Sequence, residues 1–192
     1  DKFRIKRFGL SGTGGQCLLS PPDCPIEKIP VVLYNLGGII FNLLFITLCI
    51  AVNYFSDNVY VRMVMVIMII IGIALILSNG IPLTINGMPN DGHNALYLNK
   101  TTHTKAILSN LLSLNALIQD GMRPCDVSDT YFQPLEDADL SKPMDSNLAL
   151  FHITTLVDRG ETDKAINLCK QINDKSKVEL FKKDVKVKLA TI

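Results

Sequence analysis

The stretch that decides the fold covers residues 59 to 94 and reads "VYVRMVMVIMIIIGIALILSNGIPLTINGMPNDGHN". Its first half is almost purely aliphatic, and Arg62 is the one charged side chain up to residue 77. From residue 78 the composition changes to Asn, Gly and Pro, and a single carboxylate follows at Asp91. The apolar run at 59–77 predicts a membrane-spanning helix, and the Pro and Gly residues predict that this helix ends at the polar cluster.

A second apolar run precedes this one, at residues 31–52, "VVLYNLGGIIFNLLFITLCIAV". It has 22 residues and no charge. A helix of that length extends roughly 33 Å, which is enough to cross the hydrocarbon core of a bilayer. The short polar loop at 53–58 then predicts an antiparallel transmembrane hairpin. We therefore expect a mainly α, integral membrane protein.

The distribution of basic residues predicts the orientation of that hairpin. Residues 1–30 carry five Lys or Arg, the loop at 53–58 carries none, and Lys100 and Lys105 follow the second span. Loops rich in Lys and Arg remain on the cytoplasmic side of a membrane. We therefore expect both chain ends in the cytoplasm and the loop outside.

The segment before the hairpin, residues 1–30, is predicted to be a membrane-associated strand and loop. Apolar and basic residues alternate at its start. This period of two is typical of a strand, so a strand is predicted within residues 1–19. A Pro-rich stretch then prevents regular structure up to Pro30. The transmembrane core is expected to extend over residues 31–98.

Residues 99–192 are predicted to form a soluble, cytoplasmic helical extension. A helix is expected from His103 to Gly121, and an acidic, Pro-containing linker over 124–146. Two helices broken at "DRGET" follow, and their spacing resembles one tetratricopeptide-like hairpin, although a generic helical pair fits it equally well. A protein partner through 146–172 is the corresponding expectation. The basic last ten residues are read as a frayed helix or a strand.

Composition excludes some classes of function. The formal net charge is +1 and there is no Trp, so no basic field interleaved with aromatic residues points to nucleic acid. The five cysteines include Cys17 and Cys24, whose separation matches no usual zinc spacing. We read them as free thiols on a reducing side of a membrane, with a disulfide between them as the alternative.

Asp91 is the first candidate for chemistry. An ionisable residue near non-helical backbone at a membrane suggests a functional site, because such backbone requires a protein-lined or watery cavity. The alternative is that the second span ends at Leu77 and that "NDG" is an ordinary exposed turn. The residues alone leave both readings open.

Gly38 and Asn42 form the second candidate, because four-residue spacing places them on one helix face. A small residue allows close helix approach and an Asn in lipid requires a partner, so a simple packing seam is the alternative reading. His93 stands two residues after Asp91, where a capping or surface role is the usual one. The sequence contains no HExxH, so this chain alone predicts no complete metal site.

Together these motifs resemble the site-2 protease family of intramembrane zinc metalloproteases. Residues 38–42 match its G-x-x-x-N motif, 79–82 match Asn-x-x-Pro, and Asp91-Gly92 matches its Asp-Gly. Residues 86–89 offer a second Asn-x-x-Pro, the interval before Asp91 is longer than usual, and Asn90 stands where Leu is usual. The resemblance covers roughly residues 8–100.

The resemblance implies a zinc-dependent endopeptidase that cleaves transmembrane substrates in a bacterial plasma membrane. Asp91 is then the third zinc ligand, and the HExxH helix is expected upstream of residue 1, so the chain by itself is expected to be inactive. Asn42, with Asn79 or Asn86, is expected to hold an unwound substrate segment, and the strand-like segment to pair with that substrate. The alternatives are a non-enzymatic membrane anchor with a helical interaction domain, or a transporter subunit that uses the Asn/Asp cluster as an ion site.

Overall fold

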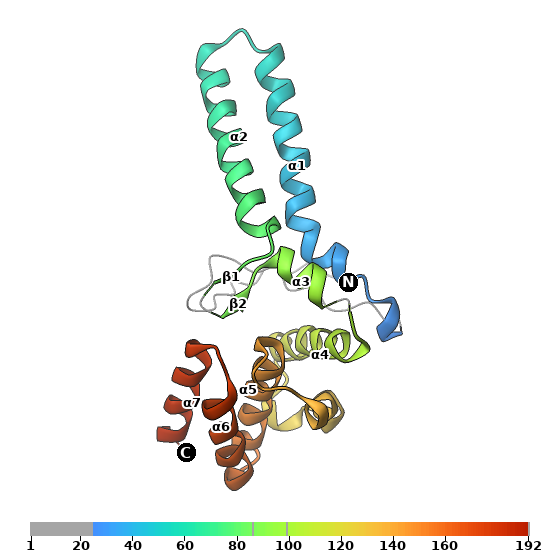
Figure 1. The fold of residues 1–192 in the computed structure, drawn as a ribbon, viewed down its shortest axis with the longest axis vertical. Coiled ribbons are helices and arrows are strands. Elements are labelled where there is room, and N and C mark those ends of the chain that lie inside the picture. The colour runs from blue at the N-terminus through green and yellow to red at the C-terminus, as the bar shows by residue number, and fades with distance from the viewer. Residues whose placement is uncertain (1–24, 86, 99, 192) are drawn as a thin grey trace.

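The computed structural model describes residues 25–85, 87–98 and 100–191. Figure 1 shows three levels: a pair of long helices, a middle level with a small β-hairpin and a short helix, and a cluster of helices that ends at the C-terminus. The strand predicted over residues 1–19 lies outside the described residues, as do Cys17 and Cys24.

The long helices are α1 (Val31–Phe55) and α2 (Val59–Gly80), and a 3₁₀ turn at Ile26–Lys28 precedes them. Each extends three residues beyond its predicted end. The helices are antiparallel, and Gly72 of α2 lies against the side chain of Ile46 on α1. Closer to the middle level, the side chain of Ile39 approaches Gly80 at the end of α2.

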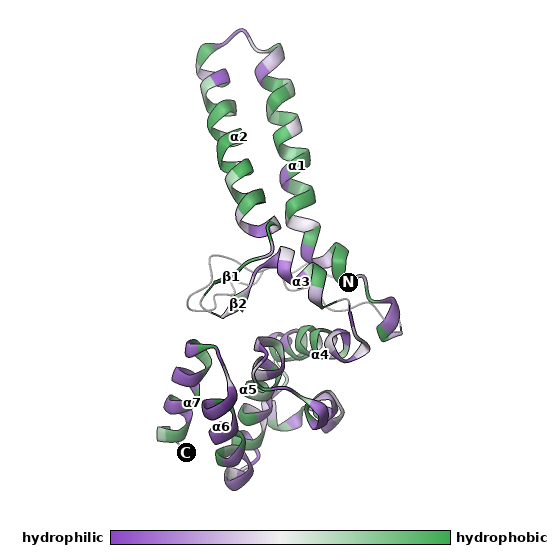
Figure 2. Ribbon diagram, in the orientation of Figure 1, coloured by the Kyte–Doolittle hydropathy of each residue, from purple (hydrophilic) through white to green (hydrophobic). Residues whose placement is uncertain are grey.

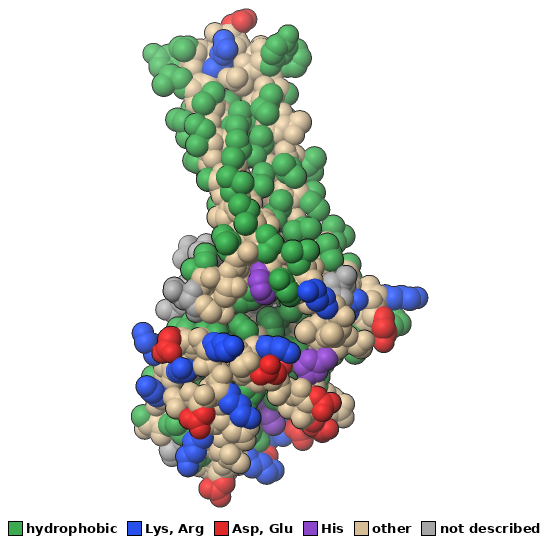
Figure 3. Space-filling view, in the orientation of Figure 1, with side chains coloured by type: hydrophobic (Ala, Val, Ile, Leu, Met, Phe, Trp, Pro, Cys, Tyr) green, Lys and Arg blue, Asp and Glu red, His purple; other side chains and the backbone are tan. Residues whose placement is uncertain are grey.

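Both long helices have the length and composition needed to cross a membrane. Only 17% of the apolar window of the first helix and 6% of that of the second is buried. The core helix of a soluble protein buries its apolar side chains. Here both long helices are hydrophobic along most of their length (Figure 2), and apolar side chains lie on the face of the pair seen in Figure 3. Charged side chains gather instead on the lower helices (Figure 3).

The middle level contains elements that were not expected from the sequence. Strands β1 (Thr84–Ile85) and β2 (Met88–Pro89) pair antiparallel around Gly87, whose φ of 83° suits a residue without a side chain. Helix α3 (Asp91–Tyr97) follows directly. The reading of "NDG" as an ordinary exposed turn is therefore wrong, because Asp91 is the first residue of a helix.

The lower helices are α4 (Thr102–Gln119), α5 (Pro143–Asp158), α6 (Thr162–Lys175) and α7 (Glu179–Thr191). The linker predicted over 124–146 contains the 3₁₀ helices η2 (Pro124–Asp126) and η3 (Asp129–Asp137), and its last four residues belong to the start of α5. Pro143 occupies the first turn of α5, where a missing N–H costs nothing. The C-terminal residues form helix α7, not a strand.

Helix α5 is the centre of the lower helices. Its Leu148 packs with residues of α4 and η3, and its Ile153 packs with residues of α6 and α7. Helices α5 and α6 form the predicted hairpin, and Gly160, with a φ of 78°, lies in the turn between them. The tetratricopeptide-like character of this pair stays a prediction.

Two contacts fix the long helices relative to the lower ones. A small apolar cluster combines Val31 at the start of α1, Leu98 after α3, and Leu108 and Leu112 of α4. In addition, Gly87 at the tip of the β-hairpin lies against the backbone of Val178, between α6 and α7. The lower helices therefore contact the middle level on both sides of the segment that contains Asp91.

Candidate functional site

Helix α3 begins at Asp91 because Asn90 caps it. The Asn90 Oδ1 accepts a hydrogen bond from the backbone N–H of His93 at 3.0 Å, the usual geometry of an N-cap. Asp91 then stands in the first helical turn, where the helix dipole favours a negative charge. The N-cap thus places this carboxylate in the first turn of α3.

The side chain of Asn90 also connects three other parts of the backbone. Its Oδ1 accepts a second hydrogen bond, from the N–H of Leu83 at 3.0 Å. Its Nδ2 donates to the carbonyl oxygens of Ser78 at 2.7 Å and Ile81 at 2.6 Å. One amide group thereby joins the last turn of α2, the start of the β-hairpin and the start of α3. It holds the neighbouring Asp91 at a fixed place relative to the end of α2.

Gly92 provides the second constraint on Asp91. A Cβ at this position would lie 2.2 Å from the carbonyl oxygen of Gly80 and 3.0 Å from that of Asn79. Both atoms belong to the backbone of α2, which cannot move aside as a flexible side chain can. The first turn of α3 therefore packs directly on the carbonyl end of α2, and only glycine fits there. This packing explains why a glycine follows Asp91.

Partial burial of Asp91 opposes the effect of the helix dipole and disfavours the charged form of the side chain. Desolvation by partial burial raises the pKa of Asp91 above its ordinary value, although the side chain keeps an exposed surface. No ion pair to Asp91 is formed by the residues that the structure describes. A carboxylate in this state gains from a cation that approaches from outside these residues.

Two further polar atoms on α3 lack partners among the described residues. The Nδ1 of His93 and the Oδ1 of Asn94 are both buried without a hydrogen bond. The His93 ring stacks on Tyr97 at a centroid distance of 4.2 Å, and the Lys100 ammonium lies 4.1 Å from the Tyr97 ring centroid. A buried unsatisfied polar atom costs about 1–3 kcal/mol. The buried side of α3 therefore keeps two hydrogen-bonding atoms without a partner among the described residues.

The structure brings some of the predicted site residues together and separates others. Asn79 lies in the last turn of α2, not in the break after it, and its backbone carbonyl faces Gly92. Asn42 lies about one turn along α1 from Ile39, between the contacts of α1 with Gly80 and Gly72. Asn86 is outside the described residues. Asn79 is thus part of the Asp91 site by its main chain, and Asn42 lies deeper between the long helices.

Sequence reasoning missed Asn90, which the structure makes the central residue of the site. The available signal was an Asn directly before a possible first turn, because Asn is a strong N-cap residue. Its bonds to Ser78 and Ile81 carried no such signal, because the two partners are 12 and 9 residues away in the chain.

A zinc ion requires three protein ligands in a catalytic site. No group of three or more His, Cys, Asp or Glu side chains that could hold a metal occurs within residues 25–85, 87–98 and 100–191. The fit to zinc is therefore partial: Asp91 offers one carboxylate ligand, and the described residues do not supply the other two.

A cavity of about 530 Å³ lies beside α3, and its described lining does not include Asp91, His93 or Asn94. The described residues of its walls are mostly apolar, and Lys100 is the charged residue among them. Its lining combines Val32 and Leu36 of α1, Gly80 and Pro82 at the end of α2, and Gly92, Ala95 and Leu96 of α3. An apolar cavity beside two long apolar helices suits a further helix better than it suits water.

Changing Asn90 to Asp separates its two roles. The carboxylate keeps the acceptor for His93 N–H and loses the two donors to Ser78 and Ile81. Asn90→Ala loses all hydrogen bonds of the Asn90 side chain. We expect Asn90→Ala to destabilise the protein by about 2–4 kcal/mol, from one lost cap and three further lost hydrogen bonds. Asn90→Asp is expected to release α3 from α2 while the helix cap persists.

Hydrogen exchange of residues 90–98, followed by mass spectrometry, measures this difference. Asn58, which caps α2 through Tyr60 N–H and Val61 N–H, provides the matched control. Asn58→Ala should cost only about 1 kcal/mol and leave exchange in α3 unchanged. Exchange in Asn90→Asp as slow as in the unmodified protein would show that the two donated bonds do not hold α3.

Comparisons with family models, with curated proteins and with solved structures return no match to this chain.

Proposed function

We propose that this chain forms the part of an intramembrane zinc metalloprotease that supplies the carboxylate ligand, Asp91. Helices α1 and α2 are then membrane spans, and α4 to α7 lie at the cytoplasmic face. One observation carries the proposal: a lone, partly desolvated carboxylate is held rigidly where an apolar, membrane-length helix ends. Asn90 and Gly92 fix this position by hydrogen bonding and by close backbone packing.

Each residue of the site has a distinct role in this proposal. Asp91 is a metal ligand, Asn90 positions it, and Gly92 lets α3 reach the carbonyl end of α2. Zinc, when bound, would supply a Lewis acid that makes its water nucleophilic at neutral pH. The remaining ligands and the general base belong to an HExxH helix outside this chain, and the apolar cavity beside α3 offers a place for it.

The proposed substrate is a transmembrane protein or peptide in the plasma membrane of a bacterium. Asn42, Asn79 and Asn86 are the candidates for holding the unwound segment of the substrate, and the structure describes the first two. The side-chain amide of Asn42 has no hydrogen-bond partner among the described residues, so it is available to an unpaired backbone group of a substrate in lipid.

The second candidate is a membrane anchor without catalytic activity that presents a helical interaction domain. The observation that favours it is a groove of about 810 Å³ between η3, α5 and α6 on the side of the lower helices. This function requires neither metal nor Asp91, so one experiment separates the two candidates.

That experiment uses the complete protein with all residues encoded upstream of Asp1, purified in detergent. Elemental analysis should find about one zinc per chain, and a chelator should remove both the zinc and the cleavage of a membrane-spanning reporter. An upstream HExxH in an apolar segment agrees with the proposal. A protein that binds no zinc and has no such motif would support the anchor instead.

A further inference from the structure

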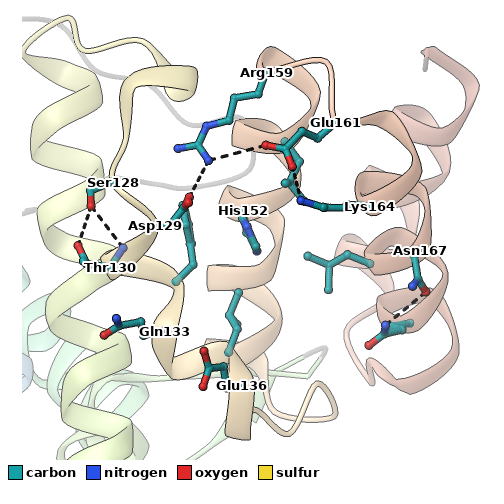
Figure 4. A pocket seen from close by; sticks show the side chains of 15 residues that line it. Ser128, Asp129, Thr130, Gln133, Glu136, His152, Arg159, Glu161, Lys164 and Asn167 are labelled. Atoms are coloured by element: carbon teal, nitrogen blue, oxygen red, sulfur yellow. Dashed lines mark hydrogen bonds and ion pairs between the residues drawn. The ribbon is translucent and has the colours of Figure 1, made fainter.

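The lower helices carry a groove that the proposed metal site does not use. Figure 4 shows it between η3 on one side and α6 on the other, with His152 of α5 between them. Its volume is about 810 Å³, within the range of ligand sites in proteins. Part of its lining is apolar: the buried Phe132 and Leu156, and the half-buried Leu135 and Leu168.

Amide and hydroxyl groups line both walls above these apolar residues. Gln133 belongs to η3, while Asn167 and Gln171 lie one turn apart on α6 and form a 3.4 Å hydrogen bond with each other (Figure 4). Ser128 and Thr130 add hydroxyl groups on the η3 side. Polar groups on two facing walls over an apolar floor suit an extended peptide, whose main chain bonds the walls while alternate side chains meet the floor.

Among the described residues, most charged side chains of the groove form ion pairs with one another, but Glu136 does not. At one end, Arg159 contacts Asp129 at 2.6 Å and Glu161 at 4.0 Å, and Lys164 contacts Glu161 at 2.6 Å, so these charges compensate one another (Figure 4). Glu136 lines another part of the groove, and no ion pair or hydrogen bond to it is formed within the described residues. Among the residues that the structure describes, the lining has three acids and two bases, which leaves one negative charge in excess.

His152 does not compensate this excess. Its ring stacks on Phe132 at a centroid distance of 4.3 Å. Burial lowers the pKa of His152 below its ordinary value, because desolvation disfavours the imidazolium. The neutral ring therefore adds to the apolar floor, and Glu136 remains the uncompensated charge.

We propose that this groove binds an extended peptide segment with a Lys or Arg that pairs with Glu136, and that this segment is the cytoplasmic juxtamembrane part of the membrane-protein substrate. The identity of the segment rests on the proposed function and on the orientation predicted for α1 and α2. Cytoplasmic segments next to a membrane span are enriched in Lys and Arg, which gives them the charge that the groove lacks.

The position of the groove agrees with this partner. Its α6 wall leads to Val178, whose backbone contacts Gly87 of the β-hairpin, and the hairpin in turn leads to Asn90. A substrate segment in the groove therefore lies on the helix that precedes Val178 and its contact with the β-hairpin. Docking there would retain a substrate near the site by raising its effective concentration.

The test measures peptide binding to the complete chain in nanodiscs of phosphatidylcholine, whose uncharged surface does not attract a basic peptide. The probe is a fluorescein-labelled peptide of alternating leucine and serine with one central lysine. Its partner probe has glutamate in place of the lysine. We expect the lysine peptide to bind more tightly, and Glu136→Gln to weaken its binding roughly fivefold, as for a partly exposed charge pair.

Charge reversal makes the assignment specific. Glu136→Lys should reverse the preference, so that the glutamate peptide binds more tightly than the lysine peptide. Asp163→Asn is the matched control, because Asp163 is an exposed acid of α6 outside the groove lining. Equal binding of both peptides to the unmodified protein, or no reversal in Glu136→Lys, would overturn the proposal.

Peptide binding does not depend on zinc or on cleavage, so the two proposals fail separately. If the groove binds the peptide but the complete protein binds no zinc, the chain is a membrane anchor with a peptide-binding site. To test the substrate assignment, the basic juxtamembrane residues of a cleaved reporter are changed to glutamate. Cleavage should fall with the unmodified chain and recover with Glu136→Lys, and a fall without recovery would reject the assignment.

Discussion

Asp91→Asn in the complete protein is expected to lose zinc and to abolish cleavage of a membrane-spanning reporter. The amide has the shape of the carboxylate but not its charge. Changes in groups that merely support a zinc ligand already cost 10- to 100-fold in affinity or activity, so losing the ligand should cost at least about a hundredfold. Elemental analysis and a gel-based cleavage assay measure the two effects.

The fold should survive this change, which separates loss of function from loss of structure. Because desolvation raises the pKa of Asp91 in the folded protein, the ionised side chain opposes folding at neutral pH. A neutral Asn removes this cost, so with zinc removed from both proteins the unfolding temperature should be unchanged or slightly higher. Asp57→Asn, in the exposed loop between α1 and α2, is the control with the same chemical change. Full zinc content in Asp91→Asn would exclude Asp91 as a ligand.

Gly92→Ala is expected to have the second-largest effect, although it adds only one methyl group. The new Cβ would lie 2.2 Å from the Gly80 oxygen, so α3 must move by roughly 1 Å to restore an ordinary contact. A displacement of that size in a catalytic group costs about a hundredfold in rate. We expect cleavage to fall by about this factor and stability to fall by about 1–3 kcal/mol.

The sign of the stability change makes this prediction specific. Gly→Ala inside a helix normally stabilises by about 0.5–1 kcal/mol. Gly37→Ala in α1, where a Cβ would meet nothing within 4 Å, is the control and should show that ordinary gain. Gly92→Ala as stable and as active as the unmodified protein would mean that α3 does not pack on the carbonyl end of α2.

The long helices could be predicted from the sequence because their signal is local. Each is a continuous apolar run, and a helix satisfies its own backbone hydrogen bonds whatever surrounds it. The ends were less well predicted: Asn79 belongs to α2, although Asn and Gly normally favour a break. The hairpin of α5 and α6 was also predictable, because Gly160 marks its turn.

Helix α3 could not be predicted, because seven residues are too few to form a stable helix alone. It exists through the cap and tether of Asn90 and through the contact of Gly92 with α2. The helices η2 and η3 escaped prediction for a similar reason: their prolines read as linker, while Arg159, bonded to Cys125 and Asp129, holds these segments against α5.

The sequence by itself determined that the chain has two apolar helices, a polar break after the second and a helical C-terminal part, because each of these follows from composition over neighbouring residues. Only the tertiary structure decided that Asp91 starts a helix and that this helix rests on the carbonyl end of α2. The physical reason is the range of the interactions. Hydrophobic runs act along the chain, whereas the bonds of Asn90 and the close approach of Gly92 join segments that meet only after folding.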